Sequence, residues 1–197
     1  MKTAVKRKAS ILAGILAAAI GAPLQASAAL ITGVGNDLID YSFSSVQGGV
    51  TLSGTVNVDV TAFNTSLRRV TLFVTLANTT PTATAGNNRW TQWGFGVAPN
   101  LGLFGITFND NNDGGMTGAS TSNFPSLPLL EACSTSGSNC AGVGSGGIFE
   151  NSSDSFTLTL RFGGSIANGV TLDPFGVKFQ AVGPTGASVE FYTPAEP

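Results

Sequence analysis

The chain has 197 residues, a formal net charge of −2 and 10% charged residues, which is less than half the share usual in soluble domains. Its 9 Lys and Arg residues are too few for the basic surface that binding to nucleic-acid phosphates requires. The sequence contains no histidine, so Ser-His-Asp catalysis, Cys-His catalysis and histidine-based zinc sites are excluded.

Residues 1–28 have the three parts of a secretory signal peptide. A basic start is followed by the apolar stretch Ile11 to Ala22, which is too short to span a bilayer, and then by the small-x-small cleavage pattern Ala26-Ser27-Ala28. Cleavage leaves five basic against eleven acidic residues, a net charge of −6 that disfavours an anionic membrane surface. We expect one domain over 29–193, a tail over 194–197 and no transmembrane segment after cleavage.

Alternating apolar and polar residues predict antiparallel strands through most of the domain. The pattern covers Ile39 to Phe43, Val50 to Val60, Val70 to Leu76, Thr91 to Val97, Phe156 to Phe162, Phe175 to Phe179 and Val189 to Phe191. Turn signals such as Gln47-Gly48-Gly49 and Gly183-Pro184 separate these segments. The sequence therefore predicts an all-β antiparallel sandwich of about eight strands, with a jelly-roll-like topology left open.

The polar stretch 109–123 predicts a long surface loop. Asn109, Asn111 and Asp113 stand at alternate positions before a glycine, as the oxygen ligands of a calcium loop do. The bidentate Glu expected seven residues after Asp113 is replaced by Ser120. A tight turn is thus the favoured interpretation, with calcium as the alternative and no other cofactor expected.

The stretch 134–147 predicts a second surface loop, because it consists mostly of Ser, Gly, Asn and Ala. Cys133 and Cys140 have six residues between them. In an exported protein this pair predicts one structural disulfide. A metal pair or a redox couple would need further ligands or a C-x-x-C spacing, and the sequence has neither.

Carboxylate chemistry is the remaining route to catalysis, as in glycosidases. The candidates lie in or beside the predicted loops: Asp110, Asp113, Glu131, Glu150 and Asp154. Their spacing places no two of them at a fixed separation on adjacent strands. We therefore expect no enzymatic activity.

A segment with two tryptophans begins at Arg89. The spacing predicts that Trp90 and Trp93 lie on opposite strand faces, and Trp93 shares its face with Phe95, which indicates a core position. We expect Trp90 to point outward beside Arg89 and Gln92, where the indole stacks on a sugar ring and the polar neighbours bind hydroxyls. The alternative for an outward Trp90 is packing under a loop or against another subunit.

The segments 69–79 and 93–100 resemble those of exported PEP-CTERM proteins. Glu131-Ala132-Cys133 and the following residues 139–147 are similar to the two-cysteine, glycine-rich centre of their cistern group. The resemblance implies an exosortase-processed surface or matrix protein of a Gram-negative bacterium, made alongside exopolysaccharide. Such proteins end in a Pro-Glu-Pro tag, a transmembrane helix and a basic cluster, whereas residues 194–197 predict either a remnant of such a tag or the end of a simply secreted chain.

We therefore expect a non-catalytic structural or adhesive protein, secreted or at the cell surface, that acts through surface contacts and self-association. The low charge of the strand faces motivates this expectation, because copies that approach edge to edge meet little repulsion. The alternative is a polysaccharide-binding module that uses Trp90 and its polar neighbours.

Overall fold

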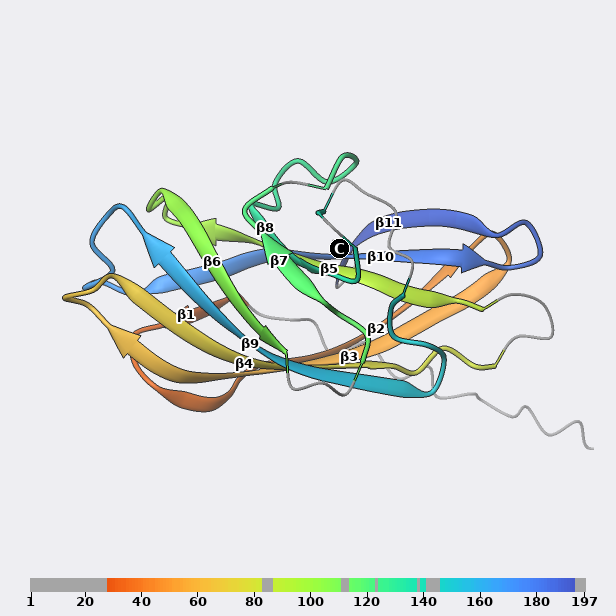
Figure 1. The fold of residues 1–197 in the computed structure, drawn as a ribbon, viewed down its shortest axis with the longest axis horizontal. Coiled ribbons are helices and arrows are strands. Elements are labelled where there is room, and N and C mark those ends of the chain that lie inside the picture. The colour runs from red at the N-terminus through yellow and green to blue at the C-terminus, as the bar shows by residue number, and fades with distance from the viewer. Residues whose placement is uncertain are drawn as a thin grey trace, which may run out of the picture.

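The computed structural model describes residues 28–82, 87–110, 114–122, 124–137, 139–140 and 146–193. Two antiparallel sheets pack against each other, which confirms the predicted β-sandwich (Figure 1). The predicted signal peptide, apart from Ala28, and the tail 194–197 lie outside the described residues. Within the described part of the chain, no helix has the length and apolar character needed to cross a membrane.

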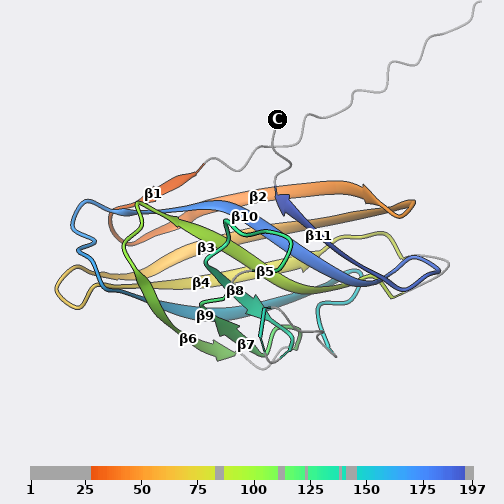
Figure 2. The same cartoon turned by 90° about the horizontal axis from the view of Figure 1, so that it is seen from above.

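Sheet A contains, in spatial order, β1 (Ala29–Ile31), β10 (Val170–Val182), β5 (Arg89–Ala98), β8 (Ala132–Thr135) and β7 (Gly118–Ser120), and β11 (Ala187–Thr193) pairs with β10 as well. Sheet B contains β2 (Gly35–Gln47), β3 (Val50–Asn64), β4 (Arg69–Asn78), β9 (Ser152–Phe162) and β6 (Leu103–Asp110). The long strands follow the length of the molecule, with the β2–β3 and β10–β11 turns at the same end (Figures 1 and 2). β2 and β6 are the edge strands of sheet B.

The period-two pattern of the sequence appears directly in the burial of the strands of sheet B. Inward residues of β3, β4 and β9 such as Val56, Leu72 and Leu158 are fully buried, and the residues between them are partly or fully exposed. The β2–β3 hairpin closes through Gly48 and Gly49 with φ values of 57° and 80°. Two positive φ angles are those of a type I′ turn, which glycine adopts without strain.

The core between the sheets is built around aromatic side chains. Trp90 stacks on Phe179 with ring centroids 5.8 Å apart and meets Phe43 edge-on at 5.2 Å. Tyr41 joins the two sheets, because its hydroxyl accepts a hydrogen bond from Trp93 Nε1 at 3.1 Å and bonds to Thr193 Oγ1 at 3.1 Å. Burial raises the pKa of the Tyr41 hydroxyl well above its usual range.

Four strands lie where the sequence pattern predicted none: β1, β6, β7 and β8. β7 falls inside the predicted loop 109–123, and the end of β8 falls inside the predicted loop 134–147. β1, β7 and β8 have only three or four residues, too few to display a periodicity, and pairing with neighbours determines them.

Candidate functional site

The outward side chains of sheet B form one continuous polar surface, which we call the open face. It carries Ser42 and Ser44 from β2, Ser53, Thr55, Asn57 and Asp59 from β3, Thr71, Phe73, Thr75 and Ala77 from β4, Ser153, Ser155, Thr157 and Thr159 from β9, and Thr107 and Asn109 from β6. Neighbouring strands lie about 4.8 Å apart and side chains on one face recur about every 6.8 Å, so these groups form an array. Hydroxyl pairs link adjacent strands, at 3.3 Å between Thr71 and Thr159 and at 3.2 Å between Thr75 and Ser155.

Phe73 is a half-buried aromatic ring at the centre of the open face. The register places it between Asp59 of β3 and Thr157 of β9. An aromatic ring surrounded by hydroxyl and carboxylate groups can contact both the apolar and the polar sides of an amphipathic ligand such as a sugar ring. The sequence analysis did not single out Phe73, although its place between the inward residues Leu72 and Val74 predicts that its side chain points outward.

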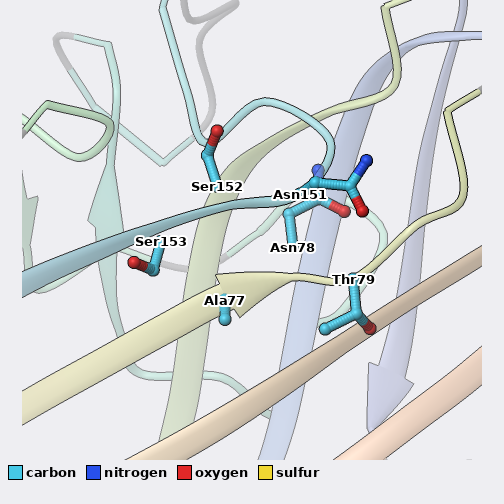
Figure 3. A pocket seen from close by; sticks show the side chains of 6 residues that line it. All are labelled: Ala77, Asn78, Thr79, Asn151, Ser152 and Ser153. Carbon is cyan, nitrogen blue, oxygen red and sulfur yellow. The ribbon is translucent and has the colours of Figure 1, made fainter.

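A pocket of about 340 Å³ lies at one end of the open face, between the end of β4 and the start of β9 (Figure 3). Its lining is small and polar and consists of Ala77, Asn78, Thr79, Asn151, Ser152 and Ser153. Ala77 and Ser153 are paired across the two strands and belong to the open face as well. The pocket therefore extends the open face with further hydroxyl and amide groups.

Hydrogen bonds hold the base of this pocket in place. The buried Asn78 amide donates to the carbonyl oxygens of Asn88 and Ile148, both at 2.9 Å, and its Oδ1 accepts from Thr80 N at 3.1 Å. Asn151, which has a φ of 57°, donates its backbone N–H to Asn78 O at 2.8 Å. The pocket shape is thus set by the fold before any ligand arrives.

The prediction that Trp90 points outward is wrong, because Trp90 is fully buried in the core. The register of β5 against β10 shifts between Gln92 and Trp90, so that Thr91 is an extra residue on β5. This bulge turns Trp90 to the same side as Trp93, which is buried as predicted. The exposed-tryptophan sugar site is therefore ruled out.

Of the other two residues of that predicted site, Gln92 forms hydrogen bonds within the protein. Gln92 is fully buried on the outer side of sheet A, where Nε2 donates to Thr135 Oγ1 at 3.3 Å and to Asn139 O at 3.2 Å. Arg89 begins β5 and is half-buried. The spacing of the sequence could not reveal a bulge, and one extra residue reversed the predicted orientation.

The outer side of sheet A, which we call the covered face, lies beneath the segment 124–131. Phe124, Leu127 and Leu130 form a second small core with Cys133, Cys140 and the partly buried Tyr192. Cys133 and Cys140 lie at disulfide distance, with Cα atoms 6.1 Å apart, as the sequence predicted. The disulfide joins Cys133, near the start of β8, to Cys140, and closes the loop that follows this strand.

Glycines on the covered face allow this close approach. A Cβ at Gly96 would lie 2.6 Å from both Asp173 O and Leu129 O, and a Cβ at Gly176 would lie 2.6 Å from the Leu130 side chain. Backbone oxygens cannot yield as a flexible side chain can. The covered face is therefore built for internal packing.

A buried ion pair lies under the same cover. Lys178 Nζ is 2.9 Å from Glu190 Oε1, and the two side chains are 7% and 10% exposed. Burial alone would raise the pKa of Glu190, but the hydrogen bonds from Lys178 and from Ser126 N–H lower it below its usual value. The Glu190 carboxylate therefore stays ionised near neutral pH, 2.9 Å from Lys178 Nζ.

Three of the five candidate catalytic carboxylates accept hydrogen bonds from backbone N–H groups. Glu131 Oε2 accepts from Val97 N at 2.8 Å, Glu150 Oε1 accepts from Asn88, and the buried Asp154 accepts from Met116 N. Asp110 ends β6, opposite Phe156. Across the residues with a described placement, no three His, Cys, Asp or Glu side chains come together in a group that could hold a metal.

The calcium alternative falls mostly outside the described residues. Asn109 lies on β6, exposed and paired with Thr157, whereas Asn111 and Asp113 are not among the described residues. The expected tight turn at this position is likewise outside them.

Comparisons with protein-family models, with curated proteins and with solved structures find no match for this chain.

Proposed function

We propose that the protein is a non-catalytic structural or adhesive component of the cell surface or extracellular matrix of a Gram-negative bacterium, acting through surface contacts and self-association. The observation that carries the proposal is the open face, where hydroxyl and amide groups extend across all five strands of sheet B without a covering segment among the described residues. The signal-like residues 1–28 and the resemblance to exported PEP-CTERM proteins support placement outside the cytoplasm.

Two properties suit such a face to contact. Its side chains are mostly Ser and Thr, which donate and accept hydrogen bonds without a fixed charge. Its strands are fixed by the packed core, so that little ordering entropy is lost when a large partner binds. Many weak contacts over one broad surface then add up to retention.

Retention on natural surfaces tests the proposal. The purified protein is incubated with washed Gram-negative envelope fragments and, separately, with isolated matrix polysaccharide, and the bound fraction is measured after sedimentation. We expect retention by at least one of them, weakened by Thr75→Arg at the centre of the open face and unchanged by Asn168→Arg in the exposed β9–β10 loop. Absence of the protein from both pellets would contradict the proposal.

A second candidate function is a polysaccharide-binding module, and Phe73 together with the adjoining pocket favours it. Titration of the protein with soluble matrix polysaccharide, followed by calorimetry, tests this candidate. We expect saturable heat that Phe73→Ala removes and Phe104→Ala, an exposed aromatic truncation on β6, leaves in place. Equal binding by both variants would place the contact elsewhere.

A further inference from the structure

We propose that the protein forms a two-fold dimer in which the regular part of β2, residues 39–47, pairs antiparallel with β2 of a second copy. This inference rests on the proposed function, because it names the surface and the partner through which self-association occurs. Among the described strands, only β3 pairs with β2, and the bulge between Gly35 and Ile39 ends the regular part of the strand.

The backbone of Ser44 is directed away from β3. Ser44 lies opposite Ser53 in the β2–β3 register. Ser53 uses its own backbone groups on the other side, where its carbonyl accepts from Thr79 N at 3.1 Å and its N–H donates to Thr80 Oγ1 at 3.0 Å. In an antiparallel pair the residues opposite each other alternate between bonded and unbonded pairs, so the N–H and C=O of Ser44 point to the free edge.

The same parity applies along the strand. Asp40, Ser42 and Val46 each lie an even number of residues from Ser44. Their backbone N–H and C=O groups therefore point to the edge as well. Asp40, Ser44 and Val46 have exposed side chains, and that of Val46 is 70% exposed. Residues 39–47 contain neither Lys nor Pro, the residues that most often prevent edge strands from pairing.

The strand is held ready for pairing by its inward residues. Ile39, Tyr41 and Phe43 are 2%, 2% and 5% exposed and anchor β2 in the core. The Tyr41 hydroxyl also bonds to Thr193 on β11, which ties the edges of the two sheets together. Figure 2 shows β2 running along one margin of the molecule. Pairing therefore requires little ordering of the backbone.

Charge selects both the partner and the register. Asp40 is the only charged residue in 39–47. A two-fold axis at Phe43 sets Ser42 opposite Ser44 of the second copy and Asp40 opposite Val46, so the two carboxylates are kept apart. In this register every edge-directed N–H and C=O of the four residues finds a partner in the identical strand. A second copy is thus complementary to β2 in hydrogen bonding and in charge.

Sedimentation velocity over micromolar to sub-millimolar concentrations tests the proposal on the full chain. We expect the wild type to form dimers and Ser44→Lys to raise the dimer Kd by about 10-fold or more, because the introduced ammonium groups meet across the axis. The matched control is Thr55→Lys, which adds the same charge to the same face one strand further in, and we expect it to change the Kd by less than about 3-fold. Ser42→Pro is the second edge variant, since it removes an edge-directed N–H without breaking a β2–β3 bond.

The outcomes separate this proposal from the proposed function. Loss of dimers in both edge variants, with folding retained by circular dichroism, supports pairing through β2. If the wild type stays monomeric at every concentration, the proposed dimer is wrong. The retention assay then still tests the proposed function independently. Dimers that survive in both edge variants, or that Thr55→Lys abolishes, also overturn pairing through this edge.

Discussion

The two outer faces of the sandwich have the same strand geometry but opposite surroundings. The covered face carries Gly96 and Gly176, a buried ion pair and a second apolar core beneath the segment 124–131. The open face carries hydroxyl and amide side chains on five strands. A sheet face that is packed needs small or apolar residues with fixed partners, whereas a face that meets solvent or a partner tolerates polar residues with spare hydrogen-bonding capacity.

This difference indicates which substitutions will act on folding and which on contact. Changes to the covered face should cost stability, because they remove packed or paired groups. Changes to the open face should leave stability nearly unaltered and alter retention instead.

The largest effect is expected from Glu190→Ala, which leaves the Lys178 ammonium buried without its carboxylate. We predict a loss of about 3 kcal/mol in the free energy of unfolding, measured by urea denaturation at neutral pH. Because the native pKa of Glu190 is lowered, its contribution is complete above the ordinary glutamate pKa and is lost as pH falls through the lower native value. The variant should therefore lose less stability than the wild type on acidification.

The control for this prediction is Asp40→Asn on β2, whose exposed carboxylate has no comparable cover. We expect it to change the free energy of unfolding at neutral pH by less than about 0.5 kcal/mol. Equal losses of unfolding free energy in Glu190→Ala and Asp40→Asn would show that the buried ion pair contributes no more to stability than an exposed carboxylate does.

Gly96→Ala should cost about 2–3 kcal/mol, because the added Cβ meets two backbone oxygens at 2.6 Å and the cover must move. Gly118→Ala on β7 is the matched control, since a Cβ there has nothing within 4 Å. Thermal unfolding of both variants measures the difference. A Gly96→Ala protein as stable as the control would contradict the close approach of the cover to sheet A.

Removal of the disulfide with the double variant Cys133→Ala/Cys140→Ala should cost about 2 kcal/mol, since the closed loop is short. Reductant should lower the melting temperature of the wild type to about that of the variant and leave the melting temperature of the variant unchanged. If reductant still lowers the melting temperature of the variant, the stabilisation does not come from the Cys133–Cys140 disulfide.

The smallest effect is expected from a Thr→Val substitution on the open face, which we compare with a Thr→Val substitution on the covered face. Thr157→Val should change the free energy of unfolding by less than about 0.5 kcal/mol, because this residue is only half-buried. Thr135→Val on the covered face should cost about 1–2 kcal/mol, because Thr135 Oγ1 accepts from Gln92 Nε2 at 3.3 Å and from Gly137 N at 3.0 Å. Chemical denaturation of the pair compares the faces directly, and equal costs would remove the distinction between them.

Sequence periodicity was sufficient for the β-sandwich and for the long strands of sheet B. Positions such as Val56 and Leu158 alternate with Ser and Thr, and hydrophobic burial of one face needs no further information. The cysteine spacing was likewise sufficient to pair Cys133 with Cys140. These features depend on local pattern alone.

The orientation of Trp90 could not be predicted, because it depends on the bulge at Thr91, and a bulge is set by pairing with β10. The position of Phe73 on the open face follows from its parity, but its neighbours Asp59 and Thr157 come from strands far apart in the chain. The position of β2 at the edge of sheet B depends on the strand order, and the periodicity of the sequence does not predict that order. Long-range pairing thus accounts for the parts that the sequence alone left unpredicted.

Amide hydrogen exchange, measured by NMR at low and high protein concentration, tests most directly whether the molecule works through contacts of sheet B. We expect the edge-directed amides of Ser42 and Ser44 to become protected as the protein concentration rises, and the amides of Tyr41 and Phe43, bonded to β3, to be protected at every concentration. Exchange at Ser42 and Ser44 that stays fast at every concentration would contradict pairing through β2.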